Sequence, residues 1–388
     1  MYLPSIKDVK LSGKRVLVRV DFNVSLGPDN RIANDQRIRE SLPTIQFLIK
    51  NKATIILVSH LGRPDGNVVP ALSLRPVAER LSQLLGKHVL FLPEFTRQPE
   101  GSIALCENIR FYPGEEENDS AFAKKLASLA DMFVNDAFGT AHRTHASTIG
   151  VTSYIPSYAG FLLSREVELI RAAVENPKRP LVVIIGGGKT PEKIRVIEKL
   201  LDVADTIYLG GAVANTFFAT WGIGVGVSKV DHEMIEMARN VLWKATRVKA
   251  RLLLPCDVTV TNAQKTTQPV SFPYNKVPMG LGIFDIGPKA REELGEIIAT
   301  AKTIIWNGPM GLYEDERFAV GTVYTCKQIA KSKAMSIVGG GDTISTIKDE
   351  SVLKDIDLIS TGGSAMLEFI EKGTLPVIEA LKNGVKKR

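Results

Sequence analysis

Short apolar runs of strand length alternate along this chain with longer segments whose apolar residues recur three and four positions apart. Segments 121–130 and 192–201 show this helical spacing. Such alternation is typical of βαβ units, in which helices connect the strands of a parallel sheet. We expect eleven strands, at residues 16–20, 54–58, 89–92, 103–105, 132–134, 181–185, 206–209, 252–254, 303–306, 335–338 and 357–359.

Eleven strands exceed what one open sheet comfortably holds, and a length of 388 residues allows two or three domains. We therefore predict an α/β protein with two doubly wound, Rossmann-like parallel-sheet domains joined by a helix hinge. An amphipathic segment at 164–175 favours a boundary there. The predicted parts are an N-terminal domain (1–158), an interdomain helix (159–176), a C-terminal domain (177–374) and a tail (375–388) that packs back on the first domain.

The residues that follow the predicted strands differ between the two halves. In the first half they are polar or charged, whereas in the second half they are runs of glycine. Ligands of open α/β sheets bind at the carboxyl ends of the strands. The pattern thus predicts one domain for a small anion and another for a nucleotide.

The sharpest glycine run follows the apolar segment 181–185. Gly188, Lys189 and Thr190 match the last three residues of the phosphate-binding Walker A motif. Val183, however, stands where that motif requires its first glycine. Pro191 suits the first turn of a helix whose N-terminus faces an anion. The run indicates phosphate chemistry on a scaffold other than a P-loop.

Two further strings in the second half suit a nucleotide. The run from Gly339 to Thr343 offers backbone N–H groups for phosphates and the carboxylate of Asp342 for Mg²⁺. Glu314 follows the string WNGPMG at 306–311, where an acid is able to accept a ribose hydroxyl.

Arginines and histidines gather near the strand ends of the first half. Arginine forks bind carboxylate and phosphate groups, so a small phosphorylated acid is the expected ligand. His60 and His142 suit either general-base catalysis or hydrogen bonding to a phosphate, and the sequence leaves both roles open. The residues that form this group are Asp21, Asn23, Arg37, His60, Arg63, Arg110, His142 and Arg143.

Composition excludes several classes of protein. Hydrophobic residues make up 44% and charged residues 23%, and no apolar run approaches the roughly 20 residues of a membrane helix. Residues 1–10 lack the apolar core of a signal peptide, and three dispersed cysteines form no disulfide framework. We expect a cytoplasmic protein without a membrane partner.

The net charge of +7 has two interpretations, a basic surface without function or a positive cleft that attracts anionic metabolites. Basic residues are dispersed and lack interleaved aromatic residues, so we expect no nucleic-acid partner.

Taken together, these strings resemble phosphoglycerate kinase almost from end to end. The strings are RVDFNV at 19–24, SHLGRP at 59–64, NDAFGTAHR at 135–143, WNGPMG at 306–311, GGGDT at 339–343 and STGG at 360–363. The resemblance implies reversible phosphoryl transfer between ATP and 3-phosphoglycerate in glycolysis and gluconeogenesis, with Mg²⁺ as cofactor. It also implies hinge bending and a monomer.

The resemblance also assigns roles to residues. It implies that 3-phosphoglycerate is bound by Asp21, Asn23, Arg37, His60, Arg63, Arg110 and Arg143. It implies that the nucleotide is bound by Lys189, Lys193, Gly211, Glu314, Gly340, Gly341, Asp342 and Thr343, with Asp342 as the metal ligand. Arg37 and Lys189 are the expected catalytic residues.

The chain departs from the family pattern at several positions. Ser25 replaces a proline, and Ile283 stands where a glycine that contacts the nucleotide base is expected. A catalytically silent relative is the alternative function. A nucleotide-dependent ligase or a P-loop ATPase would need an acyl-phosphate acceptor site or a complete Walker A motif, and the sequence has neither.

Overall fold

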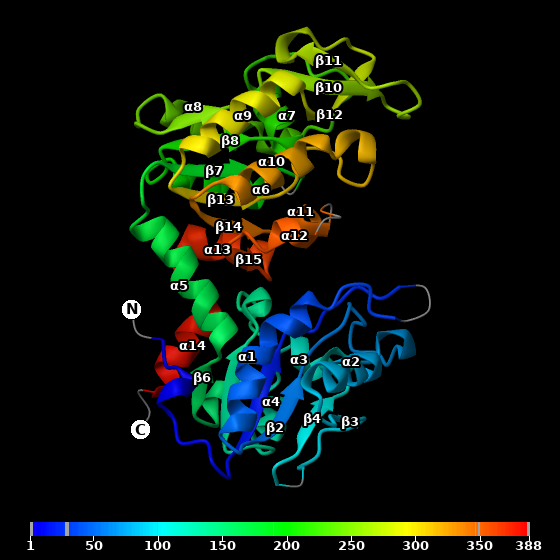
Figure 1. Ribbon diagram of the computed structural model, residues 1–388, viewed down its shortest axis with the longest axis vertical. Helices are drawn as coiled ribbons and strands as arrows, with labels where there is room; N and C mark the ends of the chain where they lie inside the picture. Colours follow the sequence, from blue (N-terminus) through cyan, green and yellow to red (C-terminus); the bar gives the residue numbers. More distant parts are fainter. Residues whose placement is uncertain are drawn as a thin grey trace. The chain divides into compact units, whose positions relative to one another are not determined.

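The computed structural model describes residues 3–27, 31–98, 100–188, 190–345, 347 and 350–385 (Figure 1). The chain divides into two compact units, one formed by residues 1–167 with 374–388 and the other by residues 168–373. The boundary between the units falls inside helix α5 (Phe161–Glu175). Each unit has its own parallel sheet and buried core, so each is an α/β domain.

The first unit is built on a six-stranded parallel sheet in the order β3-β4-β2-β1-β5-β6. Its central strands are mostly apolar and almost entirely buried, as strands covered on both faces of a parallel sheet are, and Arg19 in β1 is a buried, charged exception. Val18 pairs with Leu57 on one side and with Val134 on the other. The strands are β1 (Arg15–Val20), β2 (Thr54–Val58), β3 (Leu90–Leu92), β4 (Ile103–Cys106), β5 (Met132–Asp136) and β6 (Ser157–Ala159).

Alternate side chains of these strands enter separate cores on the two faces of the sheet. Val16 and Val18 pack in one core with Ile38, whereas Leu17 packs in the other with Leu126. Helices therefore cover both faces, as a doubly wound sheet requires. The helices of this unit, besides the start of α5, are α1 (Gln36–Lys50), α2 (Arg75–Leu85), α3 (Pro113–Glu116), α4 (Ser120–Ala127) and α14 (Pro376–Val385).

Local sequence signals explain several helix ends of the first unit. Asp119 caps α4, since its side chain accepts a hydrogen bond from the Phe122 amide at 2.7 Å. Helix α2 ends at Gly86, which adopts the left-handed conformation typical of a helix C-terminus. Helix α14 contacts β6, and the Val377 amide donates to the carbonyl of Ala141 at 3.2 Å.

The second unit has a six-stranded parallel sheet in the order β15-β14-β13-β7-β8-β9. Its strands are β7 (Leu181–Ile185), β8 (Thr206–Leu209), β9 (Arg251–Leu253), β13 (Thr303–Asn307), β14 (Met335–Gly339) and β15 (Leu358–Ser360). Its helices are α6 (Thr190–Leu200), α7 (Gly211–Thr220), α8 (Ile235–Ala245), α9 (Pro288–Thr300), α10 (Val320–Lys331), α11 (Gly341–Ser345), α12 (Glu350–Leu353) and α13 (Gly363–Lys372).

A small antiparallel sheet accompanies the parallel sheet of the second unit. Its order is β11-β10-β12, from β10 (Asp257–Asn262), β11 (Val270–Pro273) and β12 (Leu281–Ile286). Asp257 joins this sheet to α9, because its carboxylate accepts hydrogen bonds from the amides of Ala290 at 2.7 Å and Lys289 at 3.2 Å. The small sheet is thereby held beside the larger one.

The fold prediction is confirmed, and all eleven predicted strands are present. The apolar pattern missed β6 and the three antiparallel strands β10, β11 and β12. Strand β6 has three residues, and β11 is mostly exposed. Strands β10 and β12 are buried or half-buried, but polar residues or glycine interrupt their apolar positions. None of the helices in the described part of the chain has the length and hydropathy of a membrane span.

Candidate functional sites

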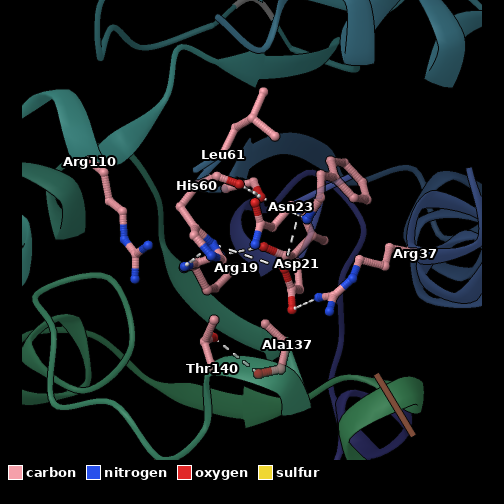
Figure 2. Close-up of polar contacts among 12 residues, drawn as sticks. Arg19, Asp21, Asn23, Arg37, His60, Leu61, Arg110, Ala137 and Thr140 are labelled. Carbon is pink, nitrogen blue, oxygen red and sulfur yellow. Dashed lines mark hydrogen bonds and ion pairs between the residues drawn. The ribbon is translucent and has the colours of Figure 1, made fainter. Parts of the chain in front are cut away.

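The first candidate site lies at the carboxyl ends of β1 and β2, where Asp21 and His60 are both buried (Figure 2). Arg37, from the first turn of α1, pairs through Nη1 with Oδ2 of Asp21. Burial by itself would raise the pKa of Asp21, but the neighbouring positive groups, Arg37 foremost, hold the pKa below its ordinary value. Asp21 is therefore an anion at neutral pH.

His60 is a neutral imidazole in this environment. Burial lowers its pKa well below the ordinary value, against the attraction of Asp21. The positive charges of Arg19, Arg110 and Arg37 lower the pKa further. A weakly basic imidazole suits hydrogen bonding to an anion better than general-base catalysis.

Gly62 connects two of the predicted site residues. Oδ1 of Asn23 accepts a hydrogen bond from the Gly62 amide at 2.9 Å, and Nη1 of Arg110 donates to the Gly62 carbonyl at 2.8 Å. Gly62 has a φ of +64°, and a Cβ there would lie 2.8 Å from Cδ2 of Leu72. Only glycine fits this turn, so the turn holds Asn23 and Arg110 in one cluster.

Arg63 and Arg143 lie beside Arg110. Both are exposed, and burial lowers the pKa of Arg110 while the charges of Arg143 and Arg63 add to that effect. Glu116 opposes them through an ion pair with Nε of Arg110 at 3.1 Å. A bound anion would relieve the repulsion among three guanidinium groups, so the cluster suits a carboxylate or a phosphate.

Asn108, which follows β4, organises the same loops. Its Oδ1 accepts hydrogen bonds from the amides of Leu61 at 3.2 Å and Arg110 at 3.1 Å. Its Nδ2 donates to the carbonyls of Leu61 at 2.7 Å and Leu72 at 3.0 Å. A fully buried asparagine with four such bonds fixes the loop after β2 against Arg110.

The second candidate site is a cavity of about 790 Å³ at the carboxyl ends of the parallel strands in the second unit. This volume falls in the usual range of small-molecule sites. The first residues of α6, α7 and α13 line the cavity, and helix N-termini favour anions. Glycine-rich loops form part of the lining, at Gly187, Gly188, Gly211, Gly308, Gly340 and Gly341.

Lys193 places its ammonium group between two of these glycine loops. Its Nζ donates to the carbonyl of Gly186, and a Cβ built on Gly187 or on Gly308 would lie 2.7 Å from Nζ. Gly308 has a φ of +91°, and its Cβ would lie 2.3 Å from the Gly186 carbonyl oxygen. The bare backbone is therefore required for the lysine to reach the cavity wall.

The other predicted nucleotide residues divide into described and undescribed ones. Gly211, Glu314, Gly340, Gly341 and Thr343 line the same cavity as Lys193. Oγ1 of Thr343 accepts a hydrogen bond from the Gly308 amide at 3.1 Å. Lys189 lies outside the described residues, and so does the side chain of Asp342.

Apolar side chains form another part of the cavity wall, and the sequence pointed to few of them. They come from α7 and the loop that follows it, from the antiparallel sheet and from the loop after β13. Ile283 is half-buried there, on β12. The group consists of Ala214, Phe218, Val227, Val258, Ile283 and Leu312. Only the position of Ile283 was signalled by the sequence, as a departure from the family pattern.

Comparisons with known proteins show to which family the chain belongs. A family model described as phosphoglycerate kinase matches residues 6–373. The chain is 47% identical over 392 residues to the phosphoglycerate kinase of Akkermansia muciniphila, covering 97% of both proteins. It is 44% identical to that of Synechococcus elongatus, covering 98% of both.

Solved structures give the same result. The phosphoglycerate kinase of Coxiella burnetii superposes with a TM-score of 0.87 at 40% identity, over 98% of this chain and 99% of that one. The enzyme of Pyrococcus horikoshii gives a TM-score of 0.86 at 32% identity, over the full length of both. Sequence and fold agree along the whole chain, which therefore belongs to the phosphoglycerate kinase family.

Proposed function

We propose that this chain catalyses the reversible, Mg²⁺-dependent transfer of a phosphoryl group between ATP and 3-phosphoglycerate, giving ADP and 1,3-bisphosphoglycerate. Such an enzyme is a phosphotransferase with a carboxyl acceptor. The observation that carries the proposal is an arginine cluster on one unit and a glycine-lined cavity on the other, in a member of the phosphoglycerate kinase family. The comparisons do not favour a catalytically silent relative.

The first unit provides the site for 3-phosphoglycerate. This substrate has a carboxylate and a phosphate, and charge-assisted hydrogen bonds from arginines bind both groups. Arg110, Arg63 and Arg143 supply positive charge on one side of Gly62, while Arg37 supplies it beside Asp21. The residues proposed to bind this substrate are Asp21, Asn23, Arg37, His60, Arg63, Arg110 and Arg143.

The second unit provides the site for ATP or ADP. Backbone amides of the glycine loops and the Lys193 ammonium would bind the phosphates, and the apolar wall would take the base. Glu314 would accept a ribose hydroxyl. The residues proposed to bind the nucleotide are Lys189, Lys193, Gly211, Glu314, Gly340, Gly341, Asp342 and Thr343.

Phosphoryl transfer requires positioning and neutralisation of negative charge more than covalent help from the protein. The carboxylate of 3-phosphoglycerate is already an anionic nucleophile, so no general base is needed. Arg37 and Lys189 are the groups proposed to stabilise the charge that spreads over the transferring phosphoryl group. The neutral state of His60 agrees with a site that removes no proton.

Asp342 is the proposed ligand of Mg²⁺. Gly340 and Gly341 line the cavity with bare backbone directly before it, which suits a metal–phosphate complex. The described residues contain no group of three histidine, cysteine or acidic side chains that could hold a metal. Mg²⁺ in kinases needs only one or two carboxylates, because phosphates and waters complete its shell. When bound, Mg²⁺ would neutralise charge on the nucleotide phosphates.

Transfer also requires that water be kept from the phosphoryl group, since ATP would otherwise be hydrolysed. We propose that the two units close on each other by hinge bending when both substrates are bound. We also propose that the protein acts in the cytoplasm as a monomer, without a nucleic-acid or membrane partner.

A coupled assay with ATP, Mg²⁺ and 3-phosphoglycerate tests the proposal directly. We expect ADP formation that depends on 3-phosphoglycerate and that stops when Mg²⁺ is removed with a chelator. Omission of 3-phosphoglycerate is the control and should leave only slow hydrolysis. Binding of both substrates without turnover would instead support a catalytically silent relative.

A further inference from the structure

Arg19 is a buried arginine that lies behind the proposed 3-phosphoglycerate site. It occupies β1, where the neighbouring positions are apolar, and its side chain is 1% exposed. Its Nη2 lies 3.2 Å from Nδ1 of His60, and its Nη1 donates to the Val20 carbonyl (Figure 2). Its Nε donates to Oγ of Ser147 at 2.9 Å.

The Arg19 guanidinium has a fixed position because Ser147 is itself fixed. Oγ of Ser147 donates to Oε1 of Glu115 at 2.6 Å, and its amide donates to Oε2 at 2.9 Å. Glu115 is fully buried, and together with Asp21 it favours the charged form of Arg19, although burial lowers the pKa of that arginine. A guanidinium keeps its proton even after such a shift, so Arg19 remains a cation.

The contact between Arg19 and His60 determines which imidazole nitrogen is protonated. A guanidinium has only donors, so a hydrogen bond from Nη2 requires a lone pair on Nδ1. A proton on Nδ1 would point at a cation 3.2 Å away, and the Asp21 carboxylate, at 4.0 Å, is too distant to accept it. The neutral ring must therefore bear its proton on Nε2.

Nε2 is available to bind a ligand. His60 is buried, with 5% of its surface exposed. Among the described residues, no side chain or backbone group forms a hydrogen bond with its Nε2. We propose that Arg19 is a positioning residue that holds His60 in the Nε2–H tautomer, so that the neutral ring donates a hydrogen bond to an anionic oxygen of the substrate. This inference rests on the proposed function for the identity of that substrate.

Nitrogen NMR of histidine-labelled protein without ligands tests the tautomer. The chain has 5 histidines, and His60→Gln assigns the signal of interest. At pH 7.5 we expect His60 to show an unprotonated Nδ1 and a protonated Nε2. A protonated Nδ1 in the wild-type protein would overturn the inference, whatever the enzyme's activity.

Two variants separate positioning from general damage to the buried cluster. Arg19→Lys keeps the charge beside Glu115 but loses the guanidinium fork, so the His60 signals should shift toward a mixture of tautomers. Ser147→Ala is the comparison variant, since it removes the hydrogen bond to Nε of Arg19 but keeps the guanidinium with its contacts to His60 and the Val20 carbonyl, so the His60 signals should shift less than in Arg19→Lys. If the Nε2–H tautomer of His60 is unchanged in Arg19→Lys, or if Ser147→Ala loses it to the same extent, the role assigned to Arg19 is contradicted.

Steady-state kinetics provide the second readout. Arg19→Lys should raise KM for 3-phosphoglycerate by about tenfold, the cost of roughly one misdirected hydrogen bond, and leave KM for ATP unchanged. Equal changes for both substrates would contradict positioning. If the tautomer is as expected but no kinase activity is found, the proposed function fails while the assignment of His60 stands.

Discussion

The guanidinium of Arg37, on α1, is paired with the carboxylate of Asp21, which follows β1, in the first site. Asp21 is 4% exposed, whereas the side chain of Arg37 is 32% exposed. The buried carboxylate thus orients an arginine that remains about one-third exposed. The pairing of Arg37 on α1 with Asp21 at the end of β1 thus fixes the position of a positive charge that remains partly exposed.

Substitution Arg37→Ala should lower kcat by roughly a hundredfold, because it removes one preorganised group that stabilises charge in the transition state. KM for ATP should change little. Arg39→Ala is the matched control, since Arg39 lies on the same helix but is exposed and pairs with Asp35. Turnover near that of the wild type in Arg37→Ala would remove this arginine from the mechanism.

Substitution Lys193→Met should reduce kcat/KM for ATP by roughly a hundredfold, since it removes the cation that lies between the glycine loops. KM for 3-phosphoglycerate should stay the same. Lys199→Met, an exposed position on the same helix, is the control. Equal losses in both variants would mean that Lys193 supports α6 rather than the nucleotide.

Ile283 should weaken discrimination between adenine and guanine, because a branched side chain occupies part of the cavity that a purine would approach. We expect kcat/KM with GTP within about tenfold of that with ATP, a difference of roughly 1.4 kcal/mol. Ile283→Gly should restore a preference for ATP. Val270→Ala, exposed on the same small sheet, serves as control. If the wild type strongly prefers ATP and Ile283→Gly shows the same preference, Ile283 has a packing role and does not affect the choice of base.

Asp136 should make stability fall as pH rises toward neutrality. It is fully buried, its Oδ1 accepts from the Leu162 amide at 2.9 Å, and burial raises its pKa to about 7. In the unfolded chain the pKa of this carboxyl is near 3.8. Between pH 3.8 and pH 7 the Asp136 carboxyl keeps its proton in the folded state but has lost it in the unfolded state. The stability that this proton contributes is therefore complete below pH 3.8 and is lost as the pH rises through about 7.

Asp136→Asn removes this titration. The melting temperature of the variant, relative to the wild type, should therefore be higher at pH 8 than at pH 5. Asp65→Asn, at an exposed position, should show no such difference between the two pH values. A relative melting temperature for Asp136→Asn that falls from pH 5 to pH 8 would refute the sign.

Binding of both substrates should make the protein more compact, since transfer requires that the two ligand sites meet and exclude water. Small-angle scattering should give the smallest radius of gyration when 3-phosphoglycerate and a non-hydrolysable ATP analogue are both present. Each ligand alone is the control. An unchanged radius under saturation with both would argue against closure.

The sequence by itself determined the two parallel sheets and the chemistry at their edges. Buried parallel strands are continuous apolar runs, and their carboxyl ends converge in space, so His60 and Gly187 could be placed at ligand sites from their positions after such runs. The same reasoning could not detect the antiparallel strands, because polar residues or glycine interrupt their apolar positions. Most of the apolar cavity wall was missed as well.

Only the tertiary structure decided which side chains act on one another. Arg19 and Ser147 are 128 residues apart, and nothing local indicates that they meet. Burial then shifts the pKa of such groups, because it removes water from their charges and leaves the neighbouring charges and hydrogen bonds to determine the protonation state. The neutral state of His60 and the pairing of Arg37 with Asp21 follow from that environment, which pattern and spacing do not encode.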